Sequence, residues 1–284
     1  MKFGEWCNTW LSIITPIRSP QTISSYRGAL RHVAGLLDRE ITDVDAPAWQ
    51  LAVNEVAAQL PRQAQLAHAA MRAAWRFGQK QGVISPNHSP WAYVAAPDHR
   101  PRPILYLTPA EMSSYARAVR STPAALPLLL MMLCGLRRGE ALGLKWSQID
   151  YRSMVIHIDC QIVNGREMRP KSRASVRKVP FCAEIAEIIA EYGDKTSRFC
   201  YNGGVSQVYS SHKRALRSAA IPAEITLHGL RHSCATAALA AGVPVTAVQH
   251  LLGHAHFSTT ADIYNHALID PQRQAVEQLA KMAV

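Results

Sequence analysis

The chain has 284 residues, 48% of them hydrophobic and 18% charged, which is enough apolar material for one or two globular domains. Its longest apolar run, "ALPLLLMMLCGL", is well short of the roughly 20 residues that a bilayer span needs, and residues 1–20 lack a signal-peptide core, so we expect a cytoplasmic protein without membrane contact. The net charge of +11 favours a polyanionic partner, whereas six dispersed cysteines without a C-x-x-C pair indicate neither a zinc site nor a disulfide framework.

Residues 1–97 are predicted to form an all-helical domain. In the segment 19–38, apolar residues from Ile23 to Leu37 recur at spacings of three and four, which places them on one helical face. The next helix has Pro47 in its first turn, and the third ends at Gly82. The expected helices cover residues 19–38, 45–60 and 61–82.

A proline-rich stretch follows, and residues 98–105 are predicted to link this domain to a second one over residues 106–284. The second domain begins with a well-defined helix start. Thr108 can cap the helix, Pro109 can occupy its first position, and Glu111 can complete a capping box.

The rest of the second domain is predicted to be helical with a small β-sheet. Residues 123–144 indicate two buried helices, and the β-branched runs of residues 153–181 flank Asn164-Gly165, a turn pair that favours a hairpin. Helical patterns return over residues 182–193, 228–242 and 244–254 and from Asp270 onward. The expected fold class is therefore mainly α with a small β-sheet, the second domain being α+β.

Positive charge is concentrated in one segment, "REMRPKSRASVRK", at residues 166–178. Its only acidic residue is Glu167, and its cations are Arg166, Arg169, Lys171, Arg173, Arg177 and Lys178. A charge cluster by itself usually marks a solvated hairpin. Combined with a pI near 9.6, this one favours contact with a phosphate backbone, and Arg138 is a further candidate for such contact.

Three motifs contain candidate site residues. In "CGLRRGEALGL", an arginine at a helix start is disfavoured by the helix dipole, so Arg137 needs a partner, and Glu140 is close in sequence. In "LHGLRHSCATAAL", His228 and Arg231 are three apart and share a helical face. In "GHAHFSTTADIYNH", His254 follows a helix end and Tyr264 comes ten residues later. Each motif alone is more often structural than catalytic.

Together, "GLRRGEALGLKW", the basic hairpin lysine, "LHGLRH" and "LLGHAHFSTTADIYNH" resemble the tyrosine recombinases of the phage integrase family in order and spacing. The resemblance implies a helical core-binding domain and a catalytic domain that form a C-shaped DNA clamp, without a further arm-site domain. By motif it implies that the catalytic residues are Arg137, Lys171, His228, Arg231, His254 and Tyr264, with Glu140 in support.

The chemistry of strand exchange needs these residue types. A tyrosine hydroxyl is only about 0.1% ionised at pH 7, so Tyr264 needs a proton acceptor, which histidine supplies. Arg137 and Arg231 can neutralise the charge of a pentacoordinate phosphate, and Lys171 can protonate the departing 5′ oxygen. We expect no cofactor, ATP or metal, since no carboxylate or cysteine at suitable spacing joins the clustered histidines.

The resemblance also implies partners. They are double-stranded DNA recombination sites, three further copies of the chain in a tetramer, and accessory proteins that bend DNA or set direction, all at the nucleoid. An exchanged C-terminal helix, predicted from Asp270, would couple the copies. An integrase is favoured. The alternatives are an Xer-like dimer-resolving recombinase, a type IB topoisomerase and an inert DNA-binding relative.

Overall fold

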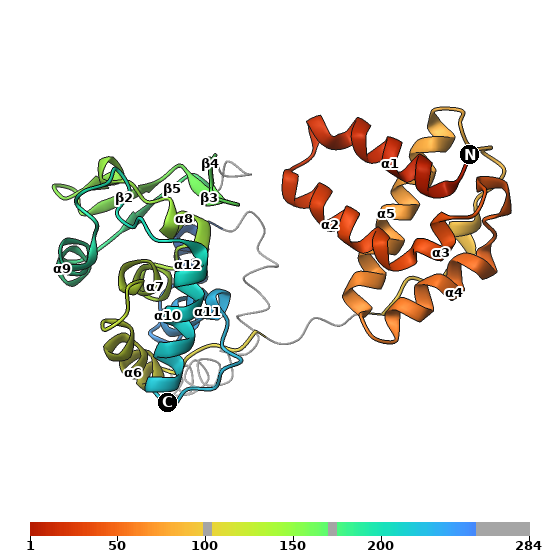
Figure 1. The fold of residues 1–284 in the computed structure, drawn as a ribbon. Coiled ribbons are helices and arrows are strands. Elements are labelled where there is room, and N and C mark those ends of the chain that lie inside the picture. Colours follow the sequence, from red (N-terminus) through yellow and green to blue (C-terminus); the bar gives the residue numbers. More distant parts are fainter. Residues whose placement is uncertain (99–103, 170–174, 254–284) are drawn as a thin grey trace, which may run out of the picture. The chain divides into compact units, whose positions relative to one another are not determined.

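The computed structural model describes residues 1–98, 104–169 and 175–253. The chain divides into two units, Met1–Arg102 and Pro103–Val284, which are described separately (Figure 1). Both consist mainly of α-helices, and the second also contains short antiparallel strands, as the sequence predicts. Within the described ranges, no helix is long and apolar enough to cross a bilayer.

The first unit is a set of helices around a core rich in aromatic side chains. Its α-helices are α1 (Phe3–Ile14), α2 (Pro20–Leu30), α3 (Ala34–Leu37), α4 (Ala46–Ala57) and α5 (Pro61–Lys80). The alanine-rich α5 contacts α1, α2 and α4. Trp75 on α5 meets the rings of Phe3 and Trp49 edge-on, and all three side chains are fully buried. This geometry adds attraction between the rings to the burial of their area.

The single helix predicted over residues 19–38 is divided in the structure. A 3-10 turn at Arg31–Val33 separates α2 from α3, and Val33 has φ −112° and ψ 30°, outside the helical region. The β-branched Val33 stands between Gly28 and Gly35, and glycine has a low helix propensity. The local sequence therefore has little preference for one continuous helix, and packing decides its path.

In the second unit, most of the described helices pack around α7. The α-helices of this unit's described residues are α6 (Pro109–Val119), α7 (Ala125–Leu133), α8 (Arg138–Leu142), α9 (Ala183–Tyr192), α10 (Val205–Ser218), α11 (Leu227–Ala240) and α12 (Val245–Leu252). α7 is apolar on all sides because it contacts α6, α8, α9, α10 and α11. The predicted capping box is confirmed: the Thr108 Oγ1 accepts from the Glu111 N–H at 3.3 Å, and the Glu111 carboxylate accepts from the Thr108 N–H at 2.7 Å.

Within the described residues, the strands form two small sheets, whereas the sequence predicts one. β1 (Ile149–Asp150), β2 (Val155–Ile158) and β5 (Arg177–Pro180) pair antiparallel in the order β1-β2-β5. β3 (Gln161–Val163) and β4 (Arg166–Met168) form the predicted hairpin. Asn164 and Gly165 have φ values of 51° and 74°, as a type I′ turn requires.

The hairpin packs closely on α8 because α8 presents glycine to it. A Cβ on Gly139 would lie 2.9 Å from the carbonyl oxygen of Ile162, and one on Gly143, the residue after α8, would lie 3.1 Å from the Ile162 nitrogen. Glycine therefore lets β3 approach the helix that begins at Arg138. The contact brings the hairpin next to Arg138, the first residue of α8.

Candidate active site

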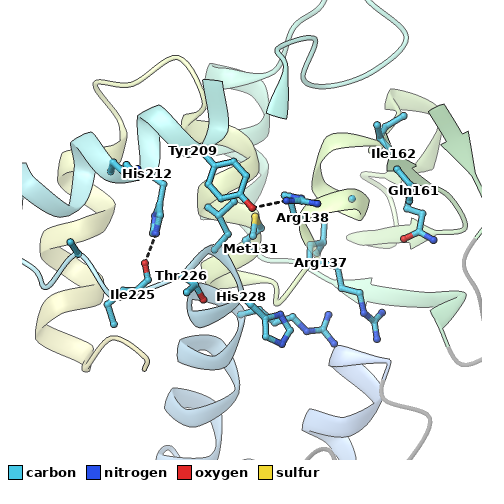
Figure 2. A pocket seen from close by; sticks show the side chains of 17 residues that line it. Met131, Arg137, Arg138, Gln161, Ile162, Tyr209, His212, Ile225, Thr226 and His228 are labelled. Carbon is cyan, nitrogen blue, oxygen red and sulfur yellow. Dashed lines mark hydrogen bonds between the residues drawn. The ribbon is translucent and has the colours of Figure 1, made fainter. Parts of the chain in front are cut away.

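A cavity of about 550 Å³ opens in the second unit. Residues of α7, α8, α10, α11 and β3 line it, and they include Arg137, Arg138, His228 and Arg231. Figure 2 shows the side chains of Arg137 and His228 reaching toward the same end of the pocket. Two of the motifs found in the sequence, far apart along the chain, therefore meet at one place.

Arg137 follows a turn that requires glycine. Gly135 has φ +63°, and a Cβ there would lie 2.6 Å from the Cδ2 of Leu252. The turn brings Arg137 to the start of α8, where its backbone N–H donates to the Glu140 carboxylate at 2.8 Å and its Nη1 donates to the same group at 2.7 Å. Its Nη2 donates to the carbonyl of Gly253 at 2.8 Å. Glu140 is therefore the partner that an arginine at a helix start needs.

The carboxylate of Glu140 is buried and joins three arginines. Arg177 donates to it from Nη1 at 3.0 Å and from Nη2 at 2.9 Å, and the Nη1 of Arg231 lies 4.0 Å away. Burial by itself would raise the pKa of Glu140, but the hydrogen bonds and charges of Arg177 and Arg137 outweigh burial and hold this pKa below its ordinary value. Glu140 is therefore ionised at neutral pH.

Arg231 lies on the first turns of α11, which Thr226 caps by accepting from the Gly229 N–H at 3.0 Å. Its side chain is only 2% exposed, and its guanidinium donates to the carbonyls of Gly135 at 2.6 Å and Leu252 at 2.5 Å. Burial and the neighbouring Arg137 lower the pKa of Arg231 to about 9, which leaves it charged at neutral pH. The side chain is thus held rigidly while it lines the cavity.

His228 lines the cavity and is exposed to solvent, with its ring centroid 4.7 Å from that of His232. Nearby protein atoms partly desolvate the His228 ring. This desolvation, followed by the positive charges of Arg231 and Arg137, lowers the pKa of His228. Burial, followed by the charges of His228 and Arg231, lowers the pKa of His232 to about 4. Both rings are therefore neutral at pH 7, and a neutral imidazole can accept a proton.

Comparison with protein families matches residues 106–269, more than half of the chain, to the phage integrase family. The chain belongs to this family. It is a site-specific tyrosine recombinase, as its motifs predict, and the fold class expected from the sequence is confirmed.

Relatives of this integrase-family chain have names of two kinds. A tyrosine recombinase XerC-like protein of Caldanaerobacter subterraneus subsp. tengcongensis is 23% identical over 97% of this chain and 82% of its own length. The prophage integrase IntF of Escherichia coli K12 is 28% identical over 60% of this chain and 37% of its own length.

Solved structures of integrases share the fold. The Tn1549 transposon integrase in complex with transposon right end DNA matches with a TM-score of 0.79 at 19% identity, over 99% of this chain and 100% of that one. A lambda integrase tetramer bound to a Holliday junction matches with a TM-score of 0.73 at 19% identity, over 93% of this chain and 77% of that one.

The predicted DNA-contact residues of this integrase-family chain separate into two groups. Arg138, Arg166, Arg169 and Lys178 are exposed, and Arg138 donates to the hydroxyl of Tyr209 at 2.7 Å at the edge of the cavity. Arg177 differs from the prediction, because its side chain is 6% exposed and is bound to Glu140. Burial in this ion pair leaves Arg177 without the surface that contact with DNA needs.

Strand alternation explains this difference. Alternate residues of a strand face the same side, and Val179, two residues after Arg177, is fully buried against β2. Arg177 therefore faces inward and Lys178 outward. The alternating pattern "RKVP" contained this signal, but the charge of the segment obscured it.

Sequence patterns did not predict a hydrogen-bonded group beside the cavity that supports the start of α11. The buried Tyr115 hydroxyl donates to the Nδ1 of His212 at 2.7 Å. The His212 Nε2 donates to the carbonyl of Ile225 at 2.8 Å, as Figure 2 shows. Burial lowers the pKa of His212, so the neutral ring can accept at one nitrogen and donate at the other. These two hydrogen bonds link α6 and α10 to Ile225, the residue just before the Thr226 cap.

Four predicted site residues, Lys171, Arg173, His254 and Tyr264, lie outside the described residues, as does the helix predicted from Asp270.

Proposed function

We propose that this recombinase cuts DNA by attack of Tyr264 on a phosphodiester held by Arg137 and Arg231. The supporting observation is the arginine cluster: three guanidiniums around one ionised carboxylate leave an excess of two positive charges beside the cavity. A phosphodiester has one negative charge and gains a second in the pentacoordinate state, so this cluster suits the transition state better than the ground state.

In the proposed step, the Tyr264 oxygen forms a bond to phosphorus and the bond from phosphorus to the 5′ oxygen breaks. The products are a 3′-phosphotyrosyl link and a free 5′ hydroxyl. One histidine, His228 or His254, accepts the tyrosine proton, and Lys171 gives a proton to the 5′ oxygen. One phosphate ester replaces another, so the 5′ hydroxyl of another strand can reverse the step without ATP or a metal.

DNA contact outside the cavity is assigned to exposed cations of the second unit and to the helical unit. The exposure of Arg138, Arg166, Arg169 and Lys178 supports contact with a phosphate backbone, and Arg173 belongs to the same basic segment. Residues 1–97 serve as the core-binding domain and residues 106–284 as the catalytic domain, joined by a linker at 98–105.

The partners are double-stranded recombination sites and further copies of this chain. The lambda integrase structure shows a tetramer on a Holliday junction, and we assign the same stoichiometry here, with the segment from Asp270 passing to a neighbour. Accessory proteins that bend DNA or set direction act with it at the nucleoid. Integration of a mobile element is favoured over dimer resolution, which the XerC-like relative makes the second candidate.

The test incubates the protein with DNA that contains candidate attachment sites and follows SDS-stable adducts and recombinant products. We expect both with the wild-type chain and neither with Tyr264→Phe, while the variant still binds the site. Adducts formed by Tyr264→Phe would contradict the assignment of the nucleophile. Adducts and plasmid relaxation without recombinants would indicate a topoisomerase, and exchange limited to directly repeated sites on one molecule would favour dimer resolution.

A further inference from the structure

The last carbonyls of α12 bind the arginines of the site. Three consecutive carbonyls accept hydrogen bonds: that of Leu251 from Arg177 at 2.7 Å, that of Leu252 from Arg231 at 2.5 Å, and that of Gly253 from Arg137 at 2.8 Å. Such carbonyls have no partner within their own helix and form the negative end of its dipole. The end of α12 is thus a second anion-like group beside Glu140.

Arg177 differs from the other two arginines because it does not line the cavity in the described part of the chain. Its Nε binds the carbonyl of Leu251, and its two terminal nitrogens bind the two oxygens of Glu140. A guanidinium so placed has no access to substrate. It joins β5 to both groups that hold Arg137 and Arg231.

We propose that Arg177 is a positioning residue for strand cleavage. It fixes the Glu140 carboxylate and the last turn of α12, and through them it sets the guanidiniums of Arg137 and Arg231. The turn ends at Gly253, the residue that precedes His254 in the sequence. This inference rests on the proposed function, because it assumes that Arg137 and Arg231 act on the phosphate.

A purely structural ion pair would behave differently from a positioning residue. It would add to the free energy of unfolding, and its loss would leave cleavage unchanged wherever the variant remains folded. Loss of a positioning residue slows the chemical step in folded protein that still binds DNA, because small displacements of catalytic groups reduce the rate strongly.

The experiment compares Arg177→Met and Arg177→Lys in the full chain, using single-turnover cleavage of a nicked site at saturating enzyme, below the unfolding temperature. Arg177→Met should cleave about 100-fold more slowly than wild type, as for loss of one transition-state donor, with unchanged DNA affinity. Arg177→Lys should be intermediate, because one ammonium retains the charge but not the fork that reaches Glu140 and Leu251 together.

Two matched controls separate this role from stability and from net charge. Val179→Ala, on the same strand and face, removes core packing but leaves the contacts of Arg177, and Arg198→Met removes one exposed cation. Both should cleave at the wild-type rate while folded. A wild-type rate for Arg177→Met, or equal slowing in Val179→Ala, would overturn the proposal.

If Arg177→Met fails to fold, Glu140→Gln/Arg177→Met removes the unpaired buried charge, and it should fold yet cleave slowly. Cleavage by this double variant at the wild-type rate would also overturn the proposal. Tyr264→Phe distinguishes the two levels of inference. Adducts formed by Tyr264→Phe would contradict the proposed function. If Tyr264→Phe forms no adducts but Arg177→Met forms them at the wild-type rate, only the positioning role is contradicted.

Discussion

Two glutamates of the second unit each lie close to several cations, but one is buried and the other is partly exposed to solvent. Glu140 is 2% exposed and lies among three arginines. Glu167, on β4, has a side chain that is 34% exposed and binds Lys145 and Arg198. Hydrogen bonds lower the pKa of both carboxyl groups, so the direction of the shift does not distinguish them.

Burial makes the difference between the two clusters. An exposed ion pair is screened by water and salt, and its long side chains exchange partners at little cost. A buried pair has no such alternatives, so its members keep one geometry. An enzyme that must hold a phosphate in a fixed place can use the Glu140 cluster for this purpose, whereas the Glu167 cluster joins the hairpin to its neighbours loosely.

The largest expected effect comes from Glu140→Ala. The variant leaves Arg177 and Arg231 buried without their carboxylate, and breaking a buried pair in this way typically costs about 3–5 kcal/mol. Urea unfolding should show a loss of that size together with loss of cleavage. Stability equal to wild type would mean that the arginines find other partners and that the contrast between the clusters is wrong.

Lysine in place of a cavity arginine should have the next largest effect, and on rate more than on stability. Arg231→Lys keeps a charge but cannot donate to Gly135, Leu252 and a phosphate together, so single-turnover cleavage should fall by about 100-fold or more while DNA binding persists. Arg198→Lys is the matched control in the exposed cluster and should cleave normally. Equal rates for both variants would remove the special role given to the buried guanidinium.

Local sequence signals predicted much of this fold. The Thr108 cap and the turn at Asn164-Gly165 follow from side-chain chemistry within a few residues, and the structure confirms both. The need of Arg137 for a partner also led to Glu140, three residues away. Such features depend on residues that are close in the sequence, so they can be predicted from a single sequence.

Local sequence signals could not predict contacts between residues that are far apart in the sequence. The contact of Arg137 with the Gly253 carbonyl joins residues 116 positions apart, and a backbone carbonyl gives no residue-type signal. The inward direction of Arg177 depends on which face of β5 meets the core, and the broken helix at Val33 depends on packing within the first unit. Each of these features is decided by tertiary contacts that override local propensity.

The pH dependence of stability should sharpen the comparison. The pKa of Glu140 is lower in the folded protein than in the unfolded chain, so its ionised form stabilises the fold above the ordinary glutamate pKa of about 4.3. This stabilisation is lost as the pH falls through the lower, folded-state pKa. The difference in unfolding free energy between wild type and Glu140→Gln should therefore be constant near neutral pH and shrink in acid. A constant difference throughout would contradict the lowered pKa.

The smallest effect is expected from Glu167→Gln. Its carboxylate is exposed, so its loss should leave the unfolding midpoint and the cleavage rate unchanged at physiological salt. The substitution frees Lys145 and Arg198 beside a basic hairpin, and the added positive potential should tighten DNA binding slightly. Because the Debye length is about 8 Å at physiological ionic strength and longer in dilute buffer, this gain should be measurable by fluorescence anisotropy at low salt and vanish as salt rises. A loss of stability as large as that of Glu140→Ala would show that exposure does not separate the two clusters.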